Sequence, residues 1–229
     1  MISVTYLSRS FSSFWNQLVP WLNSFVAHAN HALVEKIGKP IKSIDDPSFR
    51  SINNTIAFYK FVEAIRAKKI TPDMKSAYLA ASNALQFLPR NNLEHYKISR
   101  DDLGQIMNQV KLLYDTYSNS EIILHPKFPG CGIIFACEGD FIYKKTLVEV
   151  KAGDRDFTPS DFRQIILYLS LNYISQRPLK IDNIEIVNPR VGLQYLSDIV
   201  SFFDEISDKN MEEIFFEIAS FSERYSISN

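Results

Sequence analysis

The chain has 229 residues, of which 46% are hydrophobic, and a formal net charge of −1. This hydrophobic content supplies a packed core and excludes wholesale disorder, and the 7 glycines are too few for a barrel or sandwich rich in tight turns. No apolar run approaches the roughly 18 residues of a membrane-spanning helix, so no membrane partner is expected.

The first half of the chain is predicted to be helical, because its apolar side chains recur at helical spacing. Helices are expected at 11–29, with a kink or restart at Pro20, at about 57–65, at 73–88 and at 100–117. The last is the clearest, since its apolar stripe is continuous and a capping sequence precedes it. The first is interpreted as a packed helix rather than a cleaved targeting peptide.

From about residue 121 the pattern changes to short apolar segments separated by Gly and Pro. Residues 121–124 are short and apolar, and a buried strand is expected at 131–137. A hairpin is expected over 141–152, with its turn at Lys144-Lys145.

The hairpin is followed by an amphipathic helix over 159–174 and by an alternating strand over 181–187. Residues 193–206 and 210–222 are predicted to form two further amphipathic helices. The order β-β-β-α-β after a leading helix predicts an α/β fold in which a small mixed sheet is flanked by helices.

Two cysteines, Cys131 and Cys137, lie in the segment that is predicted to be a buried strand. Two residues so far apart on one strand do not easily form a disulfide, so both are expected to be free thiols. Free thiols suit a reducing compartment, which favours a cytoplasmic location. Two thiols are also too few for a zinc site built mostly from thiolates.

This pattern divides the chain into a helical N-terminal region at 1–118, an α/β core at 119–192 and C-terminal helices at 193–229. Residues 1–120 carry 14 Lys/Arg against 9 Asp/Glu, residues 121–192 carry 9 of each, and the last region carries 2 against 8. A polyanion is therefore expected to meet the front and middle of the chain rather than its acidic tail.

Three charged residues suggest a catalytic site. Glu149 and Lys151 are two positions apart on an apolar strand, so their side chains face the same way and need partners or a ligand if they are buried. A hairpin would bring Asp140 beside Glu149. A divalent cation relieves the repulsion between two carboxylates, and a neighbouring Lys can act on the attacking water and on a phosphate. Phosphodiester hydrolysis needs these parts.

The spacing of these residues resembles a known family. Gly139-Asp140, followed after eight residues by Glu149-x-Lys151, is similar to the PD-(D/E)XK nuclease superfamily, with Gly where the superfamily has Pro. The resemblance implies that Asp140 and Glu149, with the main-chain carbonyl of Val150, bind Mg²⁺ or Mn²⁺. It implies that Lys151 acts on the attacking water.

The next helix extends the resemblance. Gln164-xxx-Tyr168 is similar to the RecB-like subgroup, and the i, i+4 spacing places both side chains on one helix face. The resemblance implies that Gln164 holds the lysine or the water shell of the metal, and that Tyr168 supports the site or touches substrate. It covers about residues 120–192.

Some subgroups of the superfamily have a further metal ligand upstream of this motif. The upstream His or acidic ligand of some subgroups is not placed by the sequence, and its weak candidates are Asp115, Glu121 and His125. This leaves open the number of metal ions and the choice between endonuclease and exonuclease.

Three cations near the motif are candidates for substrate binding. Arg163 and Arg155 flank it and are expected to contact phosphate, as is Lys145 at the hairpin turn. The alternative for each is an ordinary solvated side chain. Glu138 is interpreted as a solvated strand end, with a role in metal binding as the alternative.

The expected function is divalent-metal-dependent hydrolysis of nucleic acid, DNA in preference to RNA, in a setting such as phage defence, restriction or repair. A protein partner or a homo-oligomer is expected to direct so small a nuclease. The alternatives are a catalytically inactive subunit that keeps the nuclease fold as a binding module, and an adaptor built on the helices at 11–69.

Overall fold

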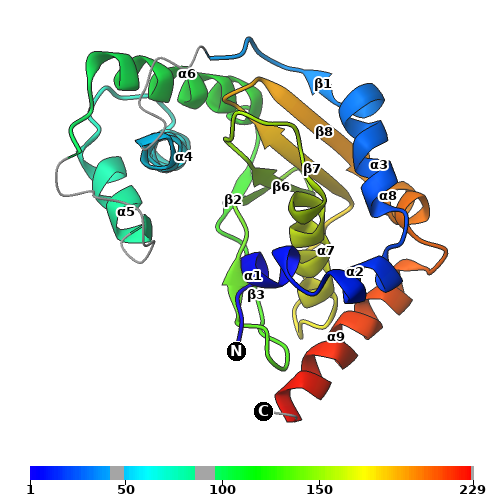
Figure 1. Ribbon diagram of the computed structural model, residues 1–229. Coiled ribbons are helices and arrows are strands. Elements are labelled where there is room, and N and C mark those ends of the chain that lie inside the picture. Colours follow the sequence, from blue (N-terminus) through cyan, green and yellow to red (C-terminus); the bar gives the residue numbers. More distant parts are fainter. Residues whose placement is uncertain (42–48, 86–95, 228–229) are drawn as a thin grey trace.

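A computed structural model describes residues 1–41, 49–85 and 96–227 of the chain. At its centre is a six-stranded mixed sheet in the order β1-β8-β7-β6-β5-β2 (Figure 1). Its strands are β1 (Glu35–Lys36), β2 (Ile122–Leu124), β5 (Phe141–Tyr143), β6 (Thr146–Val150), β7 (Asn183–Asn188) and β8 (Leu193–Asp198). Only β6 and β7 pair in parallel within this sheet. The predicted α/β class with a small mixed sheet is confirmed.

Helix α7 (Pro159–Tyr173) makes the crossover between the two parallel strands. It begins at a capping box, in which Thr158 and Asp161 satisfy each other's backbone N–H groups, and Pro159 occupies the first turn. These local signals fix the start of the helix, and they agree with the predicted span of 159–174.

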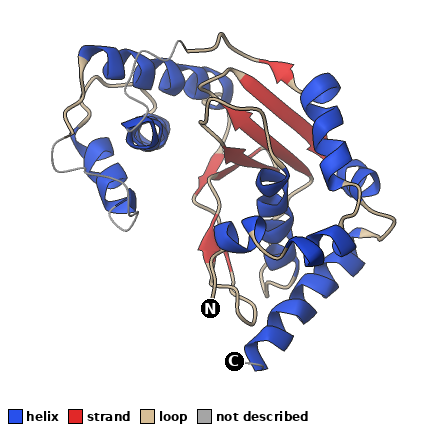
Figure 2. Ribbon diagram, in the orientation of Figure 1, coloured by secondary structure: helices blue, strands red, loops and turns tan. Residues whose placement is uncertain are grey.

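Alternation along the strands gives the sheet two buried faces. On β6, Leu147 faces a cluster that contains residues of the helices α1, α2, α3, α7, α8 and α9, whereas Val148 faces residues of α4 and α6. The first layer comprises α1 (Val4–Arg9), α2 (Ser12–Leu18), α3 (Leu22–His28), α8 (Ile199–Ile206) and α9 (Met211–Ile227). Helices thus cover the sheet on both sides (Figure 2).

The N-terminal segment forms short helices rather than one. The expected helix at 11–29 is divided into α2 and α3 around Pro20, and a π-helical turn over Ala29–Leu33 follows α3. Trp15 is fully buried, and its indole N–H donates to the Leu7 carbonyl at 2.9 Å. Strand β1 then adds to the edge of the sheet beside β8.

Three longer helices lie on the other side. They are α4 (Arg50–Ala67), α5 (Lys75–Leu85) and α6 (Arg100–Tyr117). A capping box between Ser99 and Asp102 opens α6, as expected. The predicted helix at 73–88 is seen as far as Leu85, and its last residues lie outside the described part of the chain. Among the described residues, no helix is long and apolar enough to cross a membrane.

Two predictions from the sequence are wrong. Residues 131–137 do not form a strand: Cys131 and Ile134 pair with each other across a turn in which Gly132 has φ +50°. The two cysteines are nevertheless free, as expected. Only the end of this segment is extended, where β4 (Cys137–Glu138) pairs with β3 (Lys127–Phe128) in a small separate sheet.

The second wrong prediction is the helix at 193–206. Its first part is β8, which pairs along its whole length with β7, and α8 begins only at Ile199. The Asp198 side chain caps α8 by accepting from the Ser201 N–H. Pairing with a neighbouring strand, which a single segment does not reveal, decided the conformation of these residues.

Candidate active site

Four predicted residues form one hydrogen-bonded cluster between β6 and α7. The Lys151 Nζ donates to Glu149 Oε1 and to Gln164 Oε1, both at 2.7 Å. The Gln164 Nε2 donates to Glu149 Oε1 at 2.8 Å and to the Tyr168 hydroxyl at 2.7 Å. The structure therefore brings together the Glu-x-Lys pair of the strand and the Gln-xxx-Tyr pair of the helix.

This cluster is buried. Glu149 is 4% exposed and the Lys151 side chain 18%. Tyr168 is also buried, and the ring of Phe128 from β3 stacks on it at 5.1 Å. The small β3–β4 sheet thus packs against the cluster and helps to exclude water from it.

Asp140 lies immediately before β5, at the end of the hairpin where β6 finishes. Its Oδ2 accepts a 2.7 Å hydrogen bond from the Val150 N–H. Burial, followed by the charge of Glu149, raises the pKa of Asp140 well above its usual value, although the Val150 N–H and Lys151 oppose this. Asp140 and Glu149 are therefore a repelling pair of carboxylates close to one ammonium group.

The electrostatics of Lys151 follow from the same cluster. Burial acts to lower the pKa of this ammonium group, but the carboxylates of Glu149, Asp161 and Asp140 outweigh burial and raise it. Lys151 is therefore a cation at neutral pH.

The donor set fits a hard divalent cation. Glu149 Oε2 is buried and has no hydrogen-bond partner, so the negative charge on this oxygen is not stabilised by any donor in the described part of the chain. Within the described ranges, no group of three or more His, Cys, Asp or Glu side chains is arranged to hold a metal. A cation here would be held by Asp140, Glu149, a main-chain carbonyl such as that of Val150, and water, which is how proteins commonly bind Mg²⁺.

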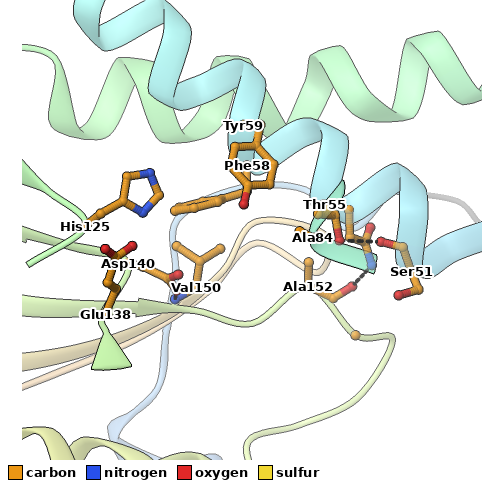
Figure 3. A pocket seen from close by; sticks show the side chains of 13 residues that line it. Ser51, Thr55, Phe58, Tyr59, Ala84, His125, Glu138, Asp140, Val150 and Ala152 are labelled. Atoms are coloured by element: carbon orange, nitrogen blue, oxygen red, sulfur yellow. Dashed lines mark hydrogen bonds between the residues drawn. The ribbon is translucent and has the colours of Figure 1, made fainter. Parts of the chain in front are cut away.

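A cavity of about 610 Å³ opens between α4 and this end of the sheet (Figure 3). Asp140 and Val150 form part of its wall, while Glu149 and Lys151 lie on the α7 side of β6. The cavity is lined by Ser51, Asn54, Thr55, Phe58, Tyr59, Ala84, His125, Glu138, Gly139, Asp140, Val150, Ala152 and Gly153. The helical N-terminal region therefore contributes one side of the cavity that reaches Asp140.

His125 is the one of the three upstream candidates that lines this cavity. It follows β2 with φ 51°, and its N–H donates to the Asp140 carbonyl at 3.0 Å. Asp115 and Glu121 line two other cavities. The pairing of β2 with β5, which ends at Leu124 and Phe141, is what places His125 beside Asp140. A sequence reading that paired these strands would have found it.

The three predicted phosphate-binding cations have other partners. Arg155 binds Asp161 through two hydrogen bonds of 2.7 and 3.0 Å, and this contact raises the pKa of its guanidinium. Arg163 lies over the Trp15 ring at 5.5 Å. Lys145 pairs with Asp182 at 3.2 Å, at the turn of the hairpin opposite to Asp140. The structure does not bring these three side chains into the cavity.

A buried arginine supports the loop that follows Lys151. Arg190 is fully buried, forms an ion pair with Asp154, and donates to Gln105 Oε1 at 2.9 Å. The Asn54 side chain of α4 donates to the Ala152 carbonyl. These bonds join the loop to α4 and α6, so they fix the helical wall of the cavity relative to the sheet. The sequence alone gives no sign that Arg190 is buried, because its partners Asp154 and Gln105 are distant in the chain.

The residues of the PD-(D/E)XK-like pattern thus come together where β6 ends, beside α7. Asp140, Glu149, Lys151, Gln164 and Tyr168 belong to one charged and hydrogen-bonded group, and the cavity reaches it at Asp140. Comparison of the chain with protein-family models, with curated proteins and with solved structures found no significant match.

Proposed function

We propose that this protein is a divalent-metal-dependent nuclease, acting on DNA in preference to RNA. The observation that carries the proposal is the repelling pair of the half-buried Asp140 and the buried Glu149, whose Oε2 has no hydrogen-bond partner, next to the Lys151 ammonium group. Two carboxylates partly removed from water destabilise the folded protein when no cation is bound, and they provide ligands for a divalent cation when one is. The basic front of the chain, with 14 Lys/Arg against 9 Asp/Glu in residues 1–120, suits a polyanionic substrate.

Each side chain has a role in this mechanism. A bound Mg²⁺ or Mn²⁺ ion supplies an acidified water and charge compensation at the phosphate. Asp140 and Glu149 hold that ion. Lys151, whose pKa is raised in the metal-free site by three carboxylates, would stabilise negative charge on the phosphate as a cation. Gln164 binds both Glu149 and Lys151 and fixes their relative orientation.

Cleavage assays test the proposal directly. Plasmid, single-stranded DNA and RNA are incubated with purified protein in Mg²⁺, Mn²⁺ or EDTA. We expect cleavage that needs the metal and that falls by roughly 10²–10³-fold in Lys151→Ala, the loss typical of removing one group that stabilises transition-state charge. Lys144→Ala, at the exposed turn of the hairpin, is the matched control and should cleave normally. Metal-dependent cleavage that survives in Lys151→Ala would rule out this site.

A second candidate is a non-catalytic subunit that keeps the nuclease fold. It is favoured by the burial of Glu149, whose Oε1 already accepts from Lys151 and Gln164. Calorimetry with Mg²⁺ separates the two candidates. Binding that is lost in Asp140→Ala supports the nuclease. An inactive subunit would bind no metal in either form.

A further inference from the structure

The cavity beside Asp140 has an aromatic wall. Phe58 and Tyr59 project from α4 over Asp140 and Val150, and the His125 ring approaches from the end of β2 (Figure 3). The His125 ring centroid lies 5.8 Å from that of Phe58 and 6.3 Å from that of Tyr59. Both α4 rings are half-buried, so they are supported by the core and still reach the cavity. A flat group inside the cavity would meet ring surfaces.

The opposite wall is acidic. It carries Glu138 and Asp140, and the described residues that line the cavity include no Lys or Arg. Away from a metal ion held at Asp140, this described lining therefore offers a phosphate group no positive partner. The Tyr59 phenol, which lines the cavity, can donate a hydrogen bond. The lining therefore suits a neutral, flat, polar-edged group.

The remaining lining can read the edge of such a group. Ser51, Asn54 and Thr55 line the cavity on the α4 side, and the loop residues Ala152 and Gly153 line it below. The Asn54 amide already donates to the Ala152 carbonyl and the Thr55 hydroxyl to the Ser51 carbonyl, so the Ser51 hydroxyl and the acceptor capacity of the Thr55 oxygen are the groups that can bond the edge of a nucleobase here.

The size of the cavity restricts how a base enters. About 610 Å³ lies within the range of small-ligand sites, roughly 300–1,000 Å³, and accommodates a nucleotide but not a duplex. A base reaches such a cavity only from a single strand or after leaving its stack. We propose that the cavity binds one unpaired nucleotide of a DNA strand, with its base against Tyr59 and Phe58 and its phosphate at the end of the cavity that Asp140 lines.

This inference rests on the proposed nuclease function for the identity of the ligand, and it adds the class of substrate. The unpaired strand is the preferred form, and duplex DNA is used at frayed or distorted positions. Tyr59 is then a specificity-determining residue, contributed by the helical region outside the 120–192 segment that carries the motif.

Binding measurements test this without cleavage. The anisotropy of a labelled single-stranded oligonucleotide and of its blunt duplex is measured in Ca²⁺, which takes oxygen ligands of the same kind as Mg²⁺. We expect the single strand to bind more tightly. Tyr59→Ala should weaken single-strand binding by roughly 5- to 100-fold, the range found for removing a stacking side chain. Tyr59→Phe, which keeps the ring, should bind like the wild type.

Two controls make the result specific. Tyr173→Ala removes a tyrosine that is 50% exposed on α7 and does not line the cavity, and it should bind like the wild type. Circular dichroism shows whether Tyr59→Ala is folded. If it is not, Tyr59→Leu, which fills the space without a ring, replaces it.

The outcomes separate this inference from the proposed function. Equal binding of duplex and single strand, or an unchanged affinity in folded Tyr59→Ala or Tyr59→Leu, overturns the inference, and metal-dependent cleavage lost in Lys151→Ala would still stand. Single-strand binding that depends on Tyr59, in a protein that cleaves nothing, supports the binding site and overturns the nuclease.

Discussion

Asp140 is the residue whose surroundings differ most from those of an ordinary surface carboxylate. Its folded-state pKa is raised above 3.8, chiefly by burial and by Glu149, so the folded state holds its proton more tightly than the unfolded state does. Its contribution to stability is therefore full below about pH 3.8 and is lost as the pH rises through the folded-state pKa. At neutral pH Asp140 therefore lowers the stability of the metal-free protein.

A substitution that removes the charge of Asp140 should remove this loss of stability. We expect Asp140→Asn to raise the Tm of the metal-free protein at pH 7, because an amide oxygen can still accept from the Val150 N–H. In the wild type, a metal at one hundred times its Kd should add about 2.7 kcal/mol, or roughly 5–11 °C in Tm. Asp140→Asn should lose this gain. Differential scanning fluorimetry with and without Mg²⁺ measures both effects.

Asp101→Asn is the control for this pair of effects, because Asp101 is exposed on α6. It should leave the gain with Mg²⁺ unchanged and should not raise the Tm, because Asp101 lies in the first turn of α6, where a negative charge is favourable. A lower Tm in metal-free Asp140→Asn would mean that the carboxylate is a net structural asset rather than a ligand kept at a cost.

Glu185 on β7 provides a test of buried charge away from the active site. It is 3% exposed, accepts from the Tyr117 hydroxyl and from Gln194, and its pKa is raised above 4.5 by burial despite these hydrogen bonds. Its contribution is therefore full below about pH 4.5 and declines as the pH rises through the folded-state pKa. The free energy of unfolding of Glu185→Gln, relative to wild type, should rise between pH 4.5 and 8. Urea titrations across this pH range measure the difference in unfolding free energy between the two proteins. A difference that stayed constant with pH would show that Glu185 is not responsible.

Sequence spacing predicted those residues of the site that share one face of a single strand or helix. Glu149 and Lys151 share a strand face, and Gln164 and Tyr168 share a helix face, so their grouping follows from periods of two and of about four residues. His125 and Tyr59 join the site only because β2 pairs with β5 and α4 packs across the sheet. Neither contact leaves a trace in local spacing.

At the scale of elements, the turn between β7 and β8 depends on glycine. Gly192 has φ +69°, and a Cβ atom there would lie 2.4 Å from the Gly38 carbonyl oxygen. Gly192 O also accepts from the Ile37 N–H at 2.9 Å, which joins the β1 segment to this turn. The turn therefore holds the edge strand of the sheet as well as closing a hairpin.

We expect Gly192→Ala to destabilise the protein by about 1–3 kcal/mol, through backbone strain and the clash with Gly38. This corresponds to a fall in Tm of roughly 2–12 °C. Gly104→Ala on α6 is the matched control, because a Cβ there meets nothing within 4 Å. It should stabilise the helix by about 0.5–1 kcal/mol. Thermal unfolding of both variants measures the two changes in Tm. Equal changes in Tm would contradict the role of Gly192 in the turn.

Prediction of the elements succeeded where local signals agreed. The helices α6 and α7 have both an apolar stripe and a capping box. It failed at 131–137 and 193–198, where apolar composition fits more than one conformation. The first segment turns on Gly132 and hydrogen bonds to Ser222 of α9, and the second becomes a strand because β7 is beside it. Both outcomes depend on partners that are distant in the sequence.

At the scale of the whole molecule, the Asp140, Glu149 and Lys151 motif lies in one part of the chain, and the elements that support it come from all of it. Strand β1 pairs with β8, so residues before 40 and after 192 together form one edge of the sheet. The largest apolar cluster includes residues of α1, α3, α7, α8 and α9. The acidic helices α8 and α9 belong to this layer, on the other side of the sheet from α4 and its cavity.

This arrangement predicts that the 119–192 segment does not fold by itself. Without β8, strand β7 would become an exposed edge, and its apolar residues Ile184, Ile186 and Val187 are all buried in the full chain. Both faces of the sheet would also lose their cover: Phe162 its partners Phe25 and Phe202, and Phe141 its partners on α4 and α6. About 70 residues with so little burial are too few for a stable core.

The expected result for the isolated segment is a far-ultraviolet spectrum of an unfolded chain, no cooperative thermal transition and no Mg²⁺ binding, whereas the full chain unfolds cooperatively. A sigmoidal transition with dispersed amide resonances in the segment would contradict it. The distinction matters for function. If the segment needs the surrounding helices in order to fold, α4 is a permanent wall of the cavity, and Tyr59 is held by the same fold that places Asp140, Glu149 and Lys151.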